Sequence, residues 1–140
     1  MQITRQADYA VRAVLYLAQL GSQGRASTAQ IAREQQIPAT FLAKIVSQLA
    51  AVGVVRATRG AHGGVTLARP PKNSTLLEIV ETIDGPIALN ECVAEPERCP
   101  LSAACPVREV WCDAQFLLVK KLAETNFGQL IQADSIAVLN

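Results

Sequence analysis

Residues 27–69 read STAQIAREQQIPATFLAKIVSQLAAVGVVRATRGAHGGVTLAR, and this stretch decides the fold. Its Ser27-x-x-Gln30 pattern predicts a capped helix start, because the two side chains can satisfy free backbone amides of the first turn. Pro38 suits the first turn of the next helix, where its missing amide proton is not needed. Two β-prone runs around clustered glycines then predict a hairpin over residues 54–69. Two short helices followed directly by a hairpin are typical of a winged helix-turn-helix.

Further helical signals flank this stretch. Apolar residues at helical spacing from Ala7 to Ala18 predict a first helix of about 15 residues. Thr75-x-x-Glu78 is a second capping box, and it opens a short helix that stops before Gly85.

The last long helix should start at Pro106 and present two apolar stripes. One stripe holds Val107, Val110, Trp111, Ala114, Leu118 and Leu122, and the other holds Cys112, Phe116, Val119 and Ala123. So wide an apolar surface predicts packing both on its own domain and on a second copy of the chain. A short helix over residues 125–133 should follow.

The elements together predict a mainly α fold with a small β-hairpin, that is, a winged helix-turn-helix plus a long dimerisation helix. Residues 1–72 form the winged domain, whose first helix also contributes to the dimer. Residues 73–106 supply a connecting helix and a cysteine segment, and residues 107–140 supply the dimerisation helix and tail.

The charge is divided unevenly along the 140 residues, although the net charge is only +1. Residues 1–72 hold nine basic and two acidic residues, a net charge of +7, whereas residues 73–140 hold four basic and ten acidic residues, a net charge of −6. A basic half indicates a surface for a polyanion. Arg59, at the tip of the hairpin, suits a phosphate or a DNA minor groove. Without a secretory signal or a run of 18 apolar residues, we expect a cytoplasmic protein with reduced cysteines and no membrane partner.

All four cysteines lie within residues 92–112, at the spacing C-x6-C-x5-C-x6-C. Zinc sites usually pair cysteines separated by two to four residues, whereas iron–sulfur clusters accept looser loops. Three prolines should keep this segment out of regular structure. Cys105, just before Pro106, should form the N-cap of the long helix, where the helix dipole favours a thiolate. Cys112 lies about 10 Å further along the helix axis and is interpreted as a small buried hydrophobe.

Three thiolates leave one ligand position open. His62 belongs to the hairpin and is a poor candidate. Carboxylates are available at Glu91, Glu95, Glu97 and Asp8, and the residues alone do not choose among them.

The whole chain resembles the bacterial iron–sulfur winged-helix regulators that include IscR and NsrR. The resemblance rests on ITRQADYAVRAVLYLA at the start, on the block from Ile31 to Pro70 with its RG-x-x-GG tip, and on Cys92, Cys99 and Cys105. It implies a homodimer whose recognition helices enter successive major grooves of a palindromic operator in double-stranded promoter DNA. The implied DNA contacts are Thr40, Lys44, Gln48 and a partly structural Phe41 on the recognition helix, Ser27 and Thr28 on phosphates, and Arg59 with His62 on the wing.

The resemblance also implies which group completes the ligand set. IscR-like members carry a histidine three residues after the third cysteine, where this chain has Arg108. NsrR-like members use an aspartate near the start of helix one of the other subunit, and Asp8 precedes Arg12 in a matching context. The implied metal ligands are therefore Cys92, Cys99, Cys105 and Asp8 of the partner subunit, around a [4Fe-4S] cluster, with [2Fe-2S] as the alternative.

The expected function is a nucleoid-associated transcriptional regulator, acting as a repressor, whose cluster senses nitric oxide, redox state or iron status. The alternative is a cluster-free regulator whose cysteine thiols form a redox switch. We do not expect an enzyme, because no nucleophile–base arrangement or nucleotide-binding loop occurs in the sequence.

Overall fold

The helix-turn-helix is present as predicted. The computed structural model describes the backbone of residues 2–139 and the side chains of residues 2–133. Helix α1 spans Arg5–Gln19, α2 spans Thr28–Gln35 and α3 spans Ala39–Ala51. Ser27 Oγ accepts from the backbone amide of Gln30 at 3.0 Å, which is the first half of the predicted capping box. The Gln30 side chain donates instead to the Tyr16 hydroxyl at 2.9 Å. Pro38 lies one residue earlier than predicted, as the N-cap of α3, so its fixed φ shapes the entry to the helix.

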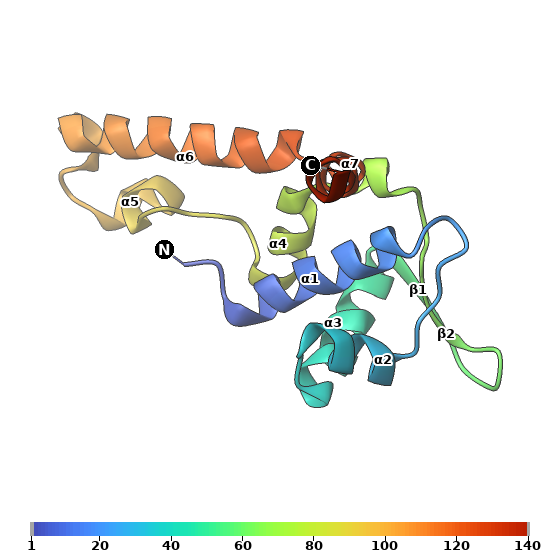
Figure 1. Ribbon diagram of the computed structural model, residues 1–140. Coiled ribbons are helices and arrows are strands. Elements are labelled where there is room, and N and C mark those ends of the chain that lie inside the picture. Colours follow the sequence, from blue (N-terminus) through green and yellow to red (C-terminus); the bar gives the residue numbers. More distant parts are fainter. Residues whose placement is uncertain (1, 140) are drawn as a thin grey trace.

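The hairpin after α3 is also present. Strands β1 (Val55–Thr58) and β2 (Gly64–Leu67) pair antiparallel, with Val55 opposite Leu67. Ala26 joins the far side of β2, because its amide donates to the carbonyl of Val65 at 3.1 Å and its carbonyl accepts from the amide of Val65 at 2.7 Å. The segment before α2 therefore supports the hairpin, which projects from the body of the protein as a wing (Figure 1).

The second half of the chain connects the winged domain to a long helix. A 3-10 turn, η1 (Pro71–Asn73), leads into α4 (Leu76–Asp84), whose Thr75 cap accepts from the Glu78 amide at 3.2 Å. Helix α6 spans Pro106–Glu124, and it begins where the proline predicted. Helix α7 spans Phe127–Leu139, which is later and longer than the predicted residues 125–133.

The cysteine segment differs from its prediction. It contains α5 (Glu91–Ala94) and the 3-10 turns η2 (Pro96–Arg98) and η3 (Ser102–Ala104), whereas we expected no regular structure. Pro96 begins η2, because the fixed φ of proline is compatible with the first turn of a helix even though it blocks the interior. None of residues 90–105 is buried.

The core gathers around α1 and is mainly aliphatic, with the aromatic rings of Tyr9 and Phe127 included. It is completed by Leu42, Ile45 and Leu49 of α3, Val65 of the wing, Ile79 of α4 and Phe127 of α7, all nearly inaccessible. Helix α6 contributes no buried residue among its described positions and lies along the outside of the molecule (Figure 1).

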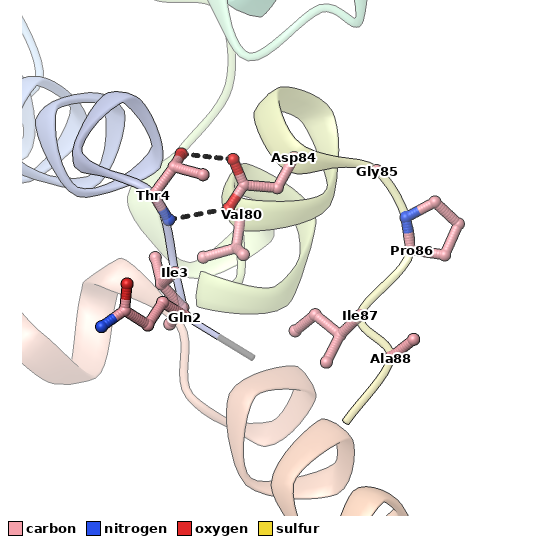
Figure 2. Close-up of a pocket in the computed structure, with 9 residues that line it drawn as sticks. All are labelled: Gln2, Ile3, Thr4, Val80, Asp84, Gly85, Pro86, Ile87 and Ala88. Atoms are coloured by element: carbon pink, nitrogen blue, oxygen red, sulfur yellow. Dashed lines mark hydrogen bonds between the residues drawn. The ribbon is translucent and has the colours of Figure 1, made fainter. Parts of the chain in front are cut away.

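The start of α1 is fastened to the end of α4. The Thr4 amide donates to Asp84 Oδ2 at 3.1 Å and its hydroxyl donates to Asp84 Oδ1 at 2.5 Å (Figure 2). These residues line a recess of about 260 Å³ whose other wall is residues 85–88. The contact fixes where α1 begins relative to the connection that leads to the cysteine segment.

Candidate nucleic-acid interface and cysteine segment

Helix α3 carries the predicted recognition residues on one stripe. Thr40, Lys44 and Gln48 are four residues apart, so they lie above one another on the helix surface. Thr40 and Lys44 are exposed, whereas Gln48 is half-buried and its Oε1 has no hydrogen-bond partner in the described part of the chain. That oxygen is buried as well as unpartnered, so the Gln48 amide would have to turn outward to meet a donor from outside the protein.

Phe41 has the partly structural position that was expected. Its ring is 40% exposed, and its centroid lies 6.2 Å from the ring centroid of the buried Tyr9. The guanidinium of Arg12 lies 4.8 Å from the same Tyr9 ring, on α1. This contact joins α1 to the surface of α3 that carries the candidate recognition residues.

The structure brings together three candidates that are far apart in the sequence. Ser27 and Thr28, at the N-terminus of α2, line one recess with Arg59 and the glycines of the wing. All three side chains are exposed, and so is His62 across the wing tip. Amides at a helix N-terminus and an arginine can both bind phosphate, so this recess is suited to a nucleic-acid backbone.

The basic residues of the winged half divide into two groups. Four arginines bind groups within the protein. Carboxylates pair with Arg12, Arg33 and Arg69. Backbone carbonyls accept hydrogen bonds from Arg12, Arg25 and Arg69. Among the basic side chains of this half that the structure describes, five have no such partner. Lys44, Arg56 and Arg59 belong to α3 and the wing, whereas Arg5 begins α1 and Lys72 lies in η1. Arg56 was not among the predicted contacts. It is exposed on β1, three residues before Arg59 in the chain.

The cysteine segment is attached to α6 by two hydrogen bonds. Arg108 Nε donates to the carbonyl of Cys92 at 3.0 Å, and Gln115 Oε1 accepts from the Leu89 amide at 2.8 Å. Arg108, which occupies the position of the absent histidine, therefore connects α5 to α6. Cys105 is the N-cap of α6, as predicted, and it lines a recess with Arg108.

The cysteines suit a metal cluster in kind but not in their arrangement within one chain. All four are free and half-buried, so Cys112 is more accessible than the buried hydrophobe that was expected. Within residues 2–133, no three histidine, cysteine or carboxylate side chains converge closely enough to hold a metal ion. One protomer in this conformation therefore does not fit an iron–sulfur cluster.

The candidate carboxylates differ in their surroundings. Asp8 lies in the first turn of α1, with its side chain 60% exposed and its Oδ2 3.2 Å from Arg12 Nε. Glu91 and Glu95 both pair with Arg98, at 3.1 and 2.5 Å. Asp8 is accessible to another molecule. To bind a metal, its carboxylate would have to break its ion pair with Arg12 or keep only one oxygen in it.

Helix α6 leaves a row of apolar side chains on the surface. Val107, Val110, Trp111 and Leu117 follow helical spacing along one side, and they are 51%, 60%, 40% and 65% exposed. Phe116, at 66%, is exposed on another side of the helix. Of the helices in the described part, none is long and apolar enough to cross a membrane.

Comparison with known proteins identifies a family. The chain matches Rrf2, described as "Iron-dependent Transcriptional regulator", over residues 3–133. It is 30% identical over 140 residues to Protein rrf2 of Nitratidesulfovibrio vulgaris, covering 100% of this chain and 93% of that protein. CymR, the global cysteine regulator of B. subtilis, is 25% identical with a TM-score of 0.80, over 95% of this chain and 98% of that one. IscR of T. potens is 22% identical with a TM-score of 0.79, over 98% of this chain and 90% of that one.

Proposed function

Because the chain belongs to the Rrf2 family of transcriptional regulators, we propose that it binds a palindromic promoter sequence as a homodimer. Rrf2 regulators bind DNA and act as dimers. The observation that supports the DNA-contacting residues is that three of the five cations of residues 1–72 without an internal partner, Lys44, Arg56 and Arg59, lie on α3 and the wing. In a two-fold dimer the two α3 helices would enter successive major grooves, and the DNA would match the symmetry of the protein.

Within each half-site the residues divide by role. Thr40, Lys44 and Gln48 reach base edges, where they supply a hydroxyl, an ammonium and an amide. Ser27 and Thr28 bind phosphate, and Arg59 with His62 enters the adjacent minor groove. The test is selection of duplexes from a random library by the purified protein, followed by titration at several salt concentrations. Enrichment of a palindrome supports the proposal, and recovery of unrelated sequences contradicts it.

We also propose that the cysteine segment is the sensing element and that Cys92, Cys99 and Cys105 provide ligands to an iron–sulfur cluster. Asp8 of the partner subunit would be the fourth ligand, [4Fe-4S] is favoured, and [2Fe-2S] is the alternative. The support is the kind of donors present, the accessibility of Asp8 and the description of the family as iron-dependent. When bound, such a cluster would supply a group that nitric oxide, oxygen or iron shortage can alter. Because the three thiols do not converge in one described chain, binding would require the segment to rearrange.

The cluster proposal is tested by measuring iron and acid-labile sulfide in anaerobically purified protein. Alanine variants of Cys92, Cys99 and Cys105 should lose iron, whereas Cys112→Ala is the matched control and should retain it. Asp8→Ala should retain less iron than the wild type. If the wild-type dimer contains no iron or sulfide after anaerobic reconstitution, the cluster proposal is rejected.

A second candidate is a thiol switch without metal. It is favoured by the four free, half-buried cysteines and by the similarity to a protein named as the global cysteine regulator. Oxidation of metal-free protein should then change its affinity for the selected duplex, and dithiothreitol should reverse the change. An oxidant that leaves the affinity of metal-free protein unaltered rejects this candidate without affecting the cluster proposal.

A further inference from the structure

Arg25 lies in the connection between α1 and α2, but its side chain reaches the tip of the wing. Its Nη1 donates a hydrogen bond to the carbonyl of His62. The next residue, Ala26, is paired with Val65 of β2 through two backbone hydrogen bonds. Arg25 thus extends, by a side-chain contact, the support that the backbone of residue 26 gives to the hairpin.

Gly64 gives an independent sign that this contact is built into the fold. Its φ is +145°, and a Cβ placed there would lie 2.8 Å from Arg25 Cγ and 3.1 Å from Arg25 Cδ. A larger residue at this position would therefore collide with the arginine stem. Because Gly64 has no side chain, the stem of Arg25 has room to pass close to it on the way to the wing tip.

The wing tip held by Arg25 carries Arg59, the residue proposed to contact DNA. The turn between the strands has one internal backbone hydrogen bond, from the Gly63 amide to the Gly60 carbonyl at 2.9 Å. Arg59 begins this turn and His62 lies near its end. A two-stranded ribbon of four-residue strands is marginally stable by itself, so its tip needs an outside contact to hold one position.

We propose that Arg25 is a positioning residue that clamps the wing and sets where Arg59 meets DNA. The inference rests on the proposed DNA contact of Arg59 and extends it to a residue outside the DNA-contact set. The clamp bridges the start of α2, with Ser27 and Thr28, and the wing tip, which are the two walls of the recess described above. Arg25 orders the tip before DNA arrives, which lowers the conformational entropy lost on binding.

The clamp is tested first without DNA, by amide hydrogen exchange. Arg25→Met keeps an unbranched stem and removes the donors, so exchange of the Gly63 amide should quicken by about tenfold. Arg25→Lys keeps a donor and should restore most of the protection. Arg33→Met is the control, because Arg33 is exposed on α2 and pairs with Glu34 at 3.9 Å. Equal exchange in Arg25→Met, Arg33→Met and the wild type overturns the proposal.

The second test separates a clamp from a direct phosphate contact. Binding of full-length protein to its selected duplex is measured against salt for Arg25→Met, Arg59→Ala and the double variant. Each single variant should reduce the slope of log affinity against log salt by about one. The double variant should also lose about one if Arg25 acts through Arg59. A loss of about two, with additive effects on affinity, would show a direct contact and overturn the clamp.

The hydrogen-exchange test and the DNA-binding test can fail independently of each other. If Arg59→Ala leaves both affinity and slope unchanged, the proposed contact of Arg59 with DNA is wrong, and with it the role of the clamp in DNA binding. Slower exchange at the tip in the wild type than in Arg25→Met would still establish the clamp as a property of the fold.

Discussion

Replacing Leu117 with alanine should weaken the dimer by about 30- to 150-fold. Leu117 is 65% exposed in the protomer and lies in the apolar row of α6. Full burial of a leucine side chain contributes about 1.5–3 kcal/mol, so the part still exposed can contribute about 1–2 kcal/mol when a partner covers it. A two-fold interface contains this residue twice, and alanine retains one methyl group, which gives a loss of about 2–3 kcal/mol.

The dissociation constant of the dimer is measured by sedimentation velocity over a dilution series. Val52→Ala is the matched control, because Val52 is 50% exposed at the end of α3 and outside the apolar row of α6. Val52→Ala should dimerise like the wild type. If Leu117→Ala does so too, or if both variants weaken the dimer equally, α6 is not the dimer helix and the reasoning from its exposed row fails.

Three further variants test other parts of the structure. Lys44→Ala should weaken binding to the selected duplex more than binding to a scrambled duplex, as measured by fluorescence anisotropy; an unchanged ratio of the two affinities would exclude the proposed contact of Lys44 with a base edge. Asp84→Ala removes both hydrogen bonds to Thr4 and should lower the free energy of unfolding in urea by about 0.5–1.5 kcal/mol, since the pair is exposed. Gly64→Ala should cost about 1–3 kcal/mol in the same assay, because its φ is positive and Arg25 occupies the space; wild-type stability would contradict the described packing.

The elements with strong local signals could be predicted from the sequence. Ser27 and Thr75 cap helices in the structure because each places a hydroxyl three residues before an amide that it accepts from. Pro106 begins α6, and the glycine-rich stretch between β1 and β2 forms the turn of the wing. These signals depend only on neighbours in the chain, so one sequence is sufficient to identify them.

The parts that depend on distant residues could not be predicted in the same way. Counting charges gave a basic half, but it could not show that Arg25 binds a carbonyl on the wing tip or that Arg69 pairs with Glu78. The pairing of Asp8 with Arg12 is a local i, i+4 contact that helical spacing does indicate. The short turns of the cysteine segment lie below the length at which periodicity identifies a helix.

Helix α1 lies between the two regions to which functions are proposed, the cysteine segment and the DNA-contacting surface of α3 and the wing. Figure 1 places the cysteine segment and the wing at opposite ends of the protomer. Between them, the start of α1 is held by Asp84 at the end of α4, and Tyr9 of α1 contacts Phe41 on the recognition helix. Because a helix is stiff over a few turns, a displacement of the connection after Asp84 would shift α1 as a unit and reach α3 through Tyr9. Coupling between the regions therefore requires that the start of α1 can take two positions relative to the end of α4. The hydrogen bonds between Thr4 and Asp84 stabilise one of these positions.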